Sequence, residues 1–357
     1  MNNKEQTYLS KSGQVNYQSP SNIAIVKYWG KTGIQIPVNP SISFTLKNAV
    51  THTSVAYQYT KGNNTLDFSF AFEGKNNPDF EKKLQVFFDR IMDTLPWLNE
   101  YKLQINSENT FPHSSGIASS ASSYSALALC LAKVHFQITG EELGINTVSN
   151  IARLGSGSAC RSVYGGWNTW GTSSLPNSDD EYAINIDDQV HDDFKNIQDS
   201  ILIVSSDKKS ISSTVGHQLM KNHPYQAGRI EQAKQNTNAL LDVLKKGNWA
   251  KFIEITESEA LSLHGLMMSS TPGYTLLHPN SLKIVQLIRE FREQKNVNIC
   301  FTIDAGPNIH VLYPLSNKKE IEEFIENSLA KYCSNNVVIN DELGFGPNET
   351  GVAGAKS

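Results

Sequence analysis

A run of small, hydroxylated residues in the first half of the chain has the composition of a phosphate-binding loop. Residues 111–124 read FPHSSGIASSASSY, with Gly116 inside the serine run. A glycine lets the backbone approach a ligand closely, and the free N–H groups and positive dipole end of a following helix favour phosphate. The hydroxyls of Ser119, Ser120 and Ser122 add groups that can bond a phosphate or a phosphate-bound metal ion. The segment therefore predicts an anion site.

The residues that follow predict the helix that such a site needs. Ile117, Ala121, Tyr124, Ala128 and Leu131 recur at helical spacing, which gives the segment one apolar face. The same composition also fits a capped helix that only packs closely against its neighbours, so both alternatives remain open at this point. The loop differs from a Walker loop, because no Gly-Lys-Ser/Thr follows the glycine.

A carboxylate and two lysines stand at the ends of apolar strands. Asp304 follows the apolar residues 299–303 and precedes Ala-Gly-Pro, so its side chain lies where a strand ends and a tight turn begins. An aspartate there often only hydrogen-bonds its own turn, which is the alternative to a catalytic role. Lys27 and Lys31 follow the apolar residues 23–26, and the aromatic residues between them favour a partly buried position over a solvated one.

Four segments follow one another over most of the chain: SPSNIAIVKYWGK at 19–31 with NPSIS at 39–43, the phosphate loop, ARLGSGSACRSVYGG at 152–166, and FTIDAGPN at 301–308. Together and in this order they resemble the diphosphomevalonate decarboxylases, a branch of the GHMP small-molecule kinases. This resemblance implies the ATP-dependent conversion of mevalonate 5-diphosphate to isopentenyl diphosphate, with release of carbon dioxide, ADP and phosphate.

The resemblance also assigns roles to residues. It implies that Asp304 is the catalytic carboxylate at the 3-hydroxyl of the substrate and that Lys27 lies beside it, holding it ionised. It places Tyr28 and Lys31 near the substrate diphosphate. It matches Ser213 to a serine that contacts substrate, and neighbouring Ser212 is a weaker candidate.

The implied decarboxylation requires a group that holds the substrate carboxylate in line with the breaking bond. Arg161 is the candidate, because a planar guanidinium binds a carboxylate in a fixed bidentate geometry. Ser156 and Ser158, with their flanking glycines, form a second nest for an anion, here the 5-diphosphate. A glycine-rich turn with a surface arginine is the alternative. Arg153, eight residues before Arg161, is expected to be peripheral.

The nucleotide is expected at the phosphate loop, with magnesium carried by ATP. The chain shows no carboxylate cluster with metal-ligand spacing, and His113, His217 and His310 show no mutual spacing of that kind. We therefore assign no direct metal ligand, although the Ser120 hydroxyl is a candidate to complete the magnesium shell. The predicted ATP-binding residues are Pro112, Gly116, Ser119, Ser120 and Ser122.

Composition predicts a cytoplasmic protein that acts on small molecules. The 357 residues carry a net charge of −4, 39% hydrophobic residues and no long apolar run, which argues against nucleic-acid and membrane partners. The cysteines are scattered without metal-ligand spacing and read as reduced, buried thiols: Cys130, Cys160, Cys300 and Cys333.

Strand and helix signals alternate in a pattern typical of two α+β domains. Strands are predicted at 23–26, 41–46, 53–59, 66–72, 101–107, 200–204, 298–303, 309–313 and 337–339. The predicted division is an N-terminal extension at 1–18, an N-terminal domain with the phosphate loop at 19–193, a C-terminal domain at 194–343 and a polar tail at 344–357. The resemblance implies the GHMP kinase fold, with an N-terminal domain like ribosomal protein S5 domain 2, a ferredoxin-like C-terminal domain, and a homodimer.

Three other functions compete with decarboxylation of the diphosphate. A kinase of the same superfamily would stop after phosphorylating mevalonate or a phosphomevalonate at the 3-position. A phosphomevalonate decarboxylase would differ only at the far end of the pocket. A non-enzymatic nucleotide sensor would be favoured by loss of Lys27, Arg161 or Asp304, and the sequence retains all three.

Overall fold

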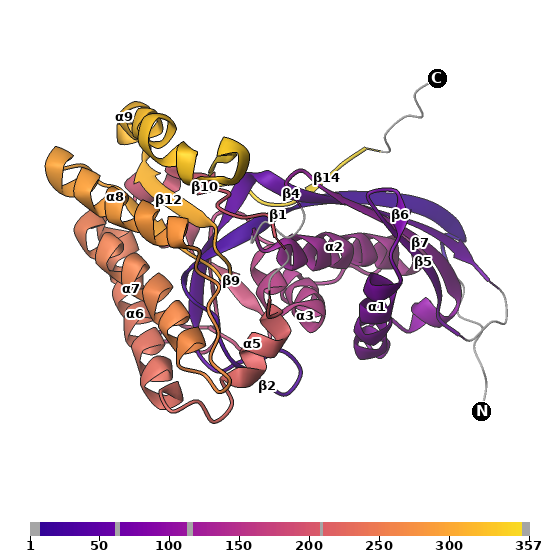
Figure 1. Ribbon diagram of the computed structural model, residues 1–357. Helices are drawn as coiled ribbons and strands as arrows, with labels where there is room; N and C mark the ends of the chain where they lie inside the picture. Colours follow the sequence, from indigo (N-terminus) through magenta and orange to yellow (C-terminus); the bar gives the residue numbers. More distant parts are fainter. Residues whose placement is uncertain (1–7, 61–64, 113–116, 208–209, 352–357) are drawn as a thin grey trace, which may run out of the picture.

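The computed structural model describes residues 8–60, 65–112, 117–207 and 210–351, and within them the predicted two-part α+β fold is confirmed. The two parts lie side by side, with the N-terminal part in indigo to magenta and the C-terminal part in orange to yellow (Figure 1). The division expected between residues 193 and 194 remains a prediction.

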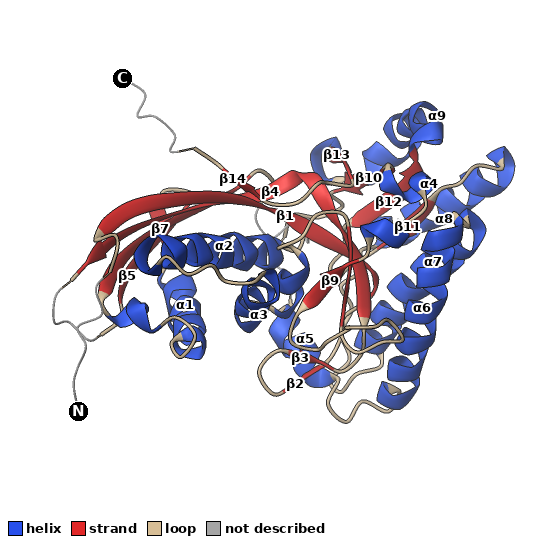
Figure 2. Cartoon of the chain, turned by 180° about the vertical axis from the view of Figure 1, so that it is seen from behind, coloured by secondary structure: helices blue, strands red, loops and turns tan. Residues whose placement is uncertain are grey.

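The N-terminal part is a mixed sheet whose helices pack on one face (Figure 2). The two long strands pair antiparallel, and β5 runs parallel to β7. Helix α2 contacts both long strands. The strands are β1 (Ser12–Val26), β4 (Ser41–Tyr59), β5 (Asp67–Phe72), β6 (Lys75–Asn76), β7 (Tyr101–Asn109), β8 (Trp167–Trp170) and β9 (Ala183–Asn185), and the helices are α1 (Pro78–Ile91), α2 (Ser119–Thr139) and α3 (Ile145–Gly155).

Local sequence explains these helices. Helix α1 begins after Asn77, whose side chain accepts a hydrogen bond from the Phe80 N–H, and it buries apolar residues at helical spacing. Helix α2 ends at Gly140, which adopts the left-handed conformation with φ 77° that favours glycine. The predicted helix after the phosphate loop is therefore confirmed.

The expected terminal segments differ from the structure. Residues 12–18, predicted to precede the first domain, form the start of β1 and pair with β4, and this start buries Val15. Within the predicted polar tail, β14 (Asn348–Glu349) pairs with β1 at Tyr17 and Gln18. Both segments are polar and carry no strong strand signal in the sequence. They nevertheless form strands, because their backbone groups hydrogen-bond to neighbouring strands.

The C-terminal part is an antiparallel sheet with the strand order β11-β12-β10-β13. Numbered along the chain, this is the order 2-3-1-4, which is ferredoxin-like, as expected. Helices α7 and α8 contact β11, and α9 contacts β12. The elements are α4 (Asp192–Lys195), β10 (Ile197–Leu202), α5 (Ser213–Leu219), α6 (Gln226–Lys246), α7 (Trp249–Met268), α8 (Pro279–Lys295), β11 (Cys300–Thr302), β12 (Ile309–Pro314), α9 (Lys318–Phe324) and β13 (Val338–Glu342).

One hydrophobic cluster joins the two parts. Phe44 and Trp167 from the first sheet lie in the same buried cluster as Phe194 and Phe252 from the second part. The ring centroids of Trp167 and Phe194 are 6.3 Å apart, and those of Phe194 and Phe252 are 4.8 Å apart. Because this cluster is close-packed, it fixes the relative position of the two parts and of the residues that meet between them.

The polar stretch 172–193 is an excursion from the first sheet, because its strand β9 pairs with β8. A small hairpin of β2 (Lys31–Thr32) and β3 (Ile36–Pro37) lies after β1. Among the helices of the described ranges, none has an apolar stretch long enough to cross a membrane.

Candidate active site

A cavity of about 870 Å³ lies between the two parts of the chain. The first part contributes Lys27, Ser120 and Arg161 to its lining, and the second contributes Ser213 and Asp304. Six of the described lining residues are lysine or arginine and one is a carboxylate, although the whole chain has a net charge of −4. The cavity therefore suits a ligand with several negative charges.

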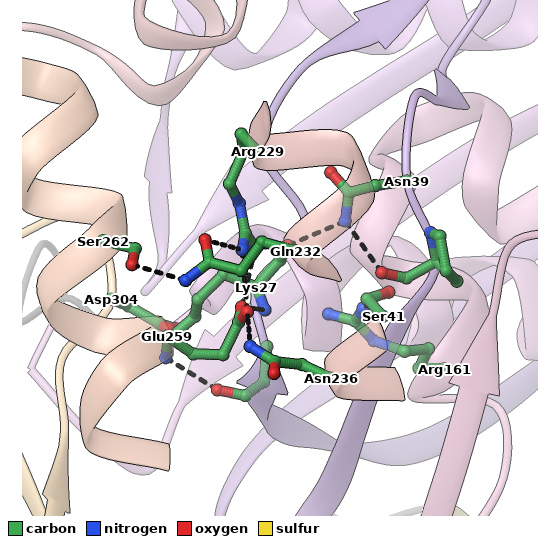
Figure 3. A network of polar contacts seen from close by, with 12 residues as sticks. Lys27, Asn39, Ser41, Arg161, Arg229, Gln232, Asn236, Glu259, Ser262 and Asp304 are labelled. Atoms are coloured by element: carbon green, nitrogen blue, oxygen red, sulfur yellow. Dashed lines mark hydrogen bonds and ion pairs between the residues drawn. The ribbon is translucent and has the colours of Figure 1, made fainter. Parts of the chain in front are cut away.

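Lys27 and Asp304 form an ion pair at the meeting of the two parts (Figure 3). Lys27 Nζ lies 2.6 Å from Asp304 Oδ1 and also donates to the carbonyl oxygen of Ala24 at 2.6 Å. The lysine is 2% exposed and the aspartate 24%, so the pair is held by protein on one side and open to the cavity on the other. The predicted proximity of these two residues is confirmed.

Arg161 is buried at the end of a 3₁₀ turn, Gly157–Arg161, and lines the same cavity. Its Nε donates to Asn22 Oδ1 at 3.1 Å, and its Nη1 donates to the hydroxyl of Ser41. Burial lowers the pKa of Arg161, while Cys160 and Asp304 act in the opposite direction. Among the ion pairs of the described residues, none involves Arg161. A buried guanidinium held by neutral acceptors is suited to a carboxylate from a ligand.

The start of α2 forms another wall of the cavity. Ala118 precedes it in a left-handed conformation, with φ 39°, and in the described chain no side chain caps its first turn. Ser119 and Ser120 line the cavity, as predicted for the phosphate loop. The first N–H groups of α2 and these hydroxyls together offer donors to an anion.

The structure separates two predicted ATP-binding residues from this wall. The Ser122 hydroxyl is buried, lies 2.6 Å from the Thr51 hydroxyl and donates to Ser119 O, so its polar group is used inside the fold. Pro112 is exposed and does not appear in the described lining. Gly116 and His113 lie outside the described residues. Ser119 and Ser122 are three residues apart, and residues at that spacing share one helix face. The spacing therefore predicted that both side chains would face the cavity and did not indicate that Ser122 points into the fold.

The second serine-rich turn faces the first. Ser156, Gly157 and Ser158 line the cavity, as predicted. A Cβ on Gly157 would lie 2.8 Å from the Tyr28 hydroxyl, so only glycine allows this close approach. Asn22 connects the turn to the arginine, because its amide donates to Ser158 O at 3.1 Å while its oxygen accepts from Arg161.

Asn22 was missed as a site residue, although it lies inside a motif that carries the resemblance. Its type gave no signal, because asparagine is common in turns and caps.

Tyr28 and Lys31 also line the cavity, as predicted. The Tyr28 ring packs against Trp170, with centroids 4.7 Å apart, and its buried hydroxyl hydrogen-bonds to no atom of the described residues. Burial lowers the pKa of Lys31, and the charge of Arg90 adds to this effect. Lys31 Nζ donates to Gln35 at 2.9 Å.

Helix α1 supplies cations that sequence analysis missed. Lys82, Lys83 and Arg90 line the cavity next to Lys31. The buried apolar residues of this helix are Leu84, Phe87, Phe88 and Ile91, whereas residues 82, 83, 86 and 90 fall on another common face. That spacing was the available signal, although surface lysines on a helix usually remain solvated.

Helix α5 closes the cavity from the second part. Ser213, Ser212 and His217 line it. The Ser212 hydroxyl caps α5 by accepting from the Val215 N–H at 3.3 Å, which makes it structural. His217 Nδ1 accepts from the Gly30 N–H at 2.9 Å, and burial lowers the pKa of His217 to about 3, with Lys31 adding to the shift. The imidazole is therefore neutral with its proton on Nε2.

Two other predictions concern residues away from the cavity. Arg153 is absent from the described lining, but it is buried rather than peripheral, because it donates to the carbonyl oxygens of Ile34 and Glu181. His310 pairs with Asp199 at 2.7 Å inside the second sheet. The described residues contain no group of three or more His, Cys, Asp and Glu arranged to hold a metal ion.

Two family models match the chain. The model for the diphosphomevalonate decarboxylase-like N-terminal domain matches residues 19–183, and the model for the mevalonate 5-diphosphate decarboxylase C-terminal domain matches residues 200–345. A diphosphomevalonate decarboxylase of Candida albicans is 33% identical over 317 residues, which are 85% of this chain and 85% of the relative.

Solved structures agree with this assignment. A mevalonate diphosphate decarboxylase from Staphylococcus aureus has a TM-score of 0.83 and 26% identity, covering 95% of this chain and 98% of its own. A structure described as MDDEF in complex with MVAPP, AMPPCP and magnesium has a TM-score of 0.82 and 26% identity, covering 96% of this chain and all of its own. The chain therefore belongs to the diphosphomevalonate decarboxylase family.

Proposed function

We propose that this protein converts mevalonate 5-diphosphate and ATP to isopentenyl diphosphate, carbon dioxide, ADP and phosphate. The observation that carries the proposal is that one cavity holds both the Lys27–Asp304 pair and the buried Arg161 guanidinium. Phosphoryl transfer needs the first group, and decarboxylation needs the second. Relatives named diphosphomevalonate decarboxylase support the same reaction.

The first step is transfer of the γ-phosphoryl group of ATP to the 3-hydroxyl oxygen. We assign Asp304 to accept the hydroxyl proton and orient the attacking oxygen, with Lys27 keeping the carboxylate ionised and offsetting charge on the transferred group. Ser119, Ser120 and the first N–H groups of α2 bind the nucleotide phosphates. The products of this step are ADP and a substrate with phosphate at C3.

The second step breaks two bonds. The C–O bond to the 3-phosphate breaks with departure of phosphate, and the electron pair of the C–C bond to the carboxylate forms the new double bond as carbon dioxide leaves. We assign Arg161 to hold the carboxylate so that this bond aligns with the emptying orbital at C3. Asn22 and Ser41 fix the guanidinium for this task.

The substrate diphosphate fits the basic end of the cavity. We assign Tyr28, Lys31, Ser156 and Ser158 to it, with Ser213 on the opposite wall. Lys82, Lys83 and Arg90 add positive charge there.

Magnesium fits as an ion carried by ATP. The cavity holds hydroxyls at Ser119 and Ser120, and its described lining contains one carboxylate, Asp304, which is paired with Lys27. Mg²⁺ keeps several waters and takes few protein ligands when substrate phosphates hold it. Bound there, the ion neutralises phosphate charge, and Ser120 is the protein group assigned to its shell.

The test of this proposal is a product assay. Purified protein is incubated with magnesium, ATP and either mevalonate 5-diphosphate or mevalonate 5-phosphate, and isopentenyl diphosphate, carbon dioxide and ADP are measured. We expect all three products from the diphosphate. ADP formation without carbon dioxide would identify a 3-kinase, and preference for the monophosphate would identify the other decarboxylase.

We also propose a cytoplasmic homodimer. The compartment is supported by Cys130, Cys160, Cys300 and Cys333, which are all buried free thiols, as is common in reducing compartments. The dimer rests on the family resemblance. Light scattering on the purified protein tests the dimer, and fractionation of the source cells tests the compartment.

A further inference from the structure

The backbone of Lys27 is held by side chains from both parts of the chain (Figure 3). Strand β1 ends at Val26, so residue 27 lies beyond the strand pairing. Its N–H donates to Glu259 Oε2 at 2.8 Å, and its carbonyl oxygen accepts from Arg229 Nη2 at 3.0 Å. Asn39 donates to the same carbonyl at 3.0 Å. Both polar backbone groups of this lysine are therefore bound by side chains.

The Glu259 carboxylate is buried and surrounded by donors. Arg229 binds it through two nitrogens, at 2.7 and 2.6 Å, and Asn236 donates to Oε1 at 2.7 Å. With the Lys27 N–H, donors from three residues converge on its two oxygens. Such a charge is stable when buried only if its partners are all present. The cluster thus has one favoured arrangement, in which the end of β1 is fixed.

Helix α7, which carries Glu259, also holds Asp304, the ion-pair partner of Lys27. Glu259 and His264 both belong to α7, and His264 Nε2 lies 3.1 Å from the carbonyl oxygen of Asp304. Helix α7 therefore contacts the backbone of both members of the Lys27–Asp304 pair. A lysine side chain has several rotatable bonds, so a fixed backbone reduces the arrangements open to its ammonium group.

We propose that Glu259 and His264 of α7, together with Arg229 of α6, are positioning residues that set the Lys27–Asp304 geometry. Glu259 acts on Lys27 through the backbone N–H, and His264 acts on Asp304 through the backbone carbonyl. This role rests on the proposed function, because the geometry matters for phosphoryl transfer. Displacement of a reacting group by about 1 Å can cost a hundredfold in rate.

Helix α7 offers a matched control two residues away. Glu257 is also buried and also binds arginines, with Arg289 Nε at 3.0 Å and Arg292 Nη1 at 2.5 Å. These arginines lie on α8, and Glu257 is absent from the described cavity lining. Glu257→Gln and Glu259→Gln thus disturb similar buried clusters in one helix, because each places an amide NH₂ group against donors. Only Glu259→Gln disturbs the Lys27 backbone.

The first test compares kinetics of these two variants with wild type. We expect Glu259→Gln to lower kcat by about tenfold to a hundredfold, with KM for both substrates changed by less than about threefold. Glu257→Gln should lower the melting temperature but keep kcat within about twofold of wild type. Equal kcat losses in the two variants would overturn the positioning role, because loss of a buried ion pair would then explain both.

The second test repeats Glu259→Gln in the Lys27→Ala background under single turnover. We expect less than about a twofold further loss, because no ammonium group remains to be positioned. A loss as large as in the wild-type background would overturn the proposal. His264→Leu leaves the Glu259 cluster intact and removes the bond to Asp304, so it serves if Glu259→Gln fails to fold. A kcat within about twofold of wild type in His264→Leu would count against the proposal.

Hydrogen exchange separates this proposal from the proposed function. The Lys27 amide should exchange faster in Glu259→Gln than in wild type and Glu257→Gln, and this measurement requires no turnover. Equal protection in all three proteins would overturn the anchoring, whatever the enzyme does. An active wild type with unchanged kcat in Glu259→Gln would overturn the positioning role and leave the proposed reaction intact.

Discussion

The hydroxyl oxygens of Ser120 and Ser156 lie 3.2 Å apart. Ser120 belongs to the first turn of α2, and Ser156 directly follows α3. The contact therefore joins the segment assigned to the nucleotide phosphates with the segment assigned to the substrate diphosphate. Both serines line one cavity, so the nucleotide phosphates and the substrate diphosphate would lie next to each other at this contact. A substitution of either serine therefore tests both binding segments.

Removing the Ser120 hydroxyl should weaken turnover and leave the fold intact. A hydroxyl that bonds a phosphate or its metal ion contributes on the order of 1.5–3 kcal/mol. We therefore expect Ser120→Ala to lower kcat/KM for ATP by about tenfold to a hundredfold in steady-state kinetics. Ser123→Ala is the control, because the Ser123 hydroxyl donates to Ser119 O within α2 and lies outside the described lining. If Ser120→Ala has wild-type kinetics, the phosphate loop is not part of the active site.

Substitutions of Asp304 and Lys27 test whether the ion pair acts as a unit. Asp304→Asn keeps the shape but loses the charge and proton acceptor, so we expect kcat to fall by about 10²–10⁴ with nearly native substrate binding. Lys27→Ala should depress the same step. Binding is measured by calorimetry and kcat by product formation. If the logarithmic loss of the double variant equals the sum of the two single losses, the residues act independently.

The sequence predicted the parts of the site that lie in short motifs. Lys27, Arg161 and Asp304 were predicted and meet at one cavity, because each follows a strand or turn whose local pattern is legible. The phosphate-loop helix was predicted from its apolar spacing and is present as α2. The motifs did not predict which way each serine side chain points. Ser119 and Ser120 line the cavity, whereas Ser122 points into the fold.

The remaining parts of the site depend on contacts between distant segments. Glu259 contacts the backbone of a residue 232 positions away, and no local pattern encodes that pairing. The basic face of α1 enters the cavity only because this helix packs beside α3. Arg153 looked like a peripheral charge, but its fork binds the carbonyl oxygens of two loops. Such residues are recognised from the fold and not from spacing.

Arg161 distinguishes a decarboxylase from a kinase. Arg161→Gln should abolish most carbon dioxide release while ATP binding is retained, because an amide lacks the charged fork that orients a carboxylate. Arg161→Lys should restore little of the carbon dioxide release, since an ammonium group supplies charge without the bidentate geometry. We would measure ADP, carbon dioxide and isopentenyl diphosphate in single turnovers.

The structure also changes the choice of control for Arg161. Arg153 is buried and holds the loop at Ile34, next to the lining residue Gln35, so Arg153→Gln would disturb the cavity wall itself. Arg289→Gln is better suited, because Arg289 pairs with Glu257 away from the described cavity lining. If Arg161→Gln decarboxylates as fast as wild type while Arg289→Gln is also normal, Arg161 does not orient the substrate carboxylate. The kinase alternative would then have to be considered again.

His217 should make the protein less stable in mild acid. Burial lowers the pKa of its imidazole from 6.5 to about 3, so between these values the unfolded chain binds a proton that the folded chain does not. The free energy of unfolding therefore rises with pH across this window: the contribution is fully present above pH 6.5 and is lost as pH falls toward 3. At pH 5 the loss from this one group is about 2 kcal/mol.

The variant His217→Asn tests this linkage, because asparagine retains an acceptor for the Gly30 N–H and does not titrate. Urea denaturation at pH 7 and pH 5 gives the change in unfolding free energy for each protein. We expect this change to be smaller in His217→Asn than in wild type by about 2 kcal/mol, even if the variant is less stable at both pH values. An equal change in both proteins would mean that the imidazole becomes protonated without unfolding, and therefore that its contacts with the Tyr28 and Trp29 rings and the Gly30 N–H open readily to water.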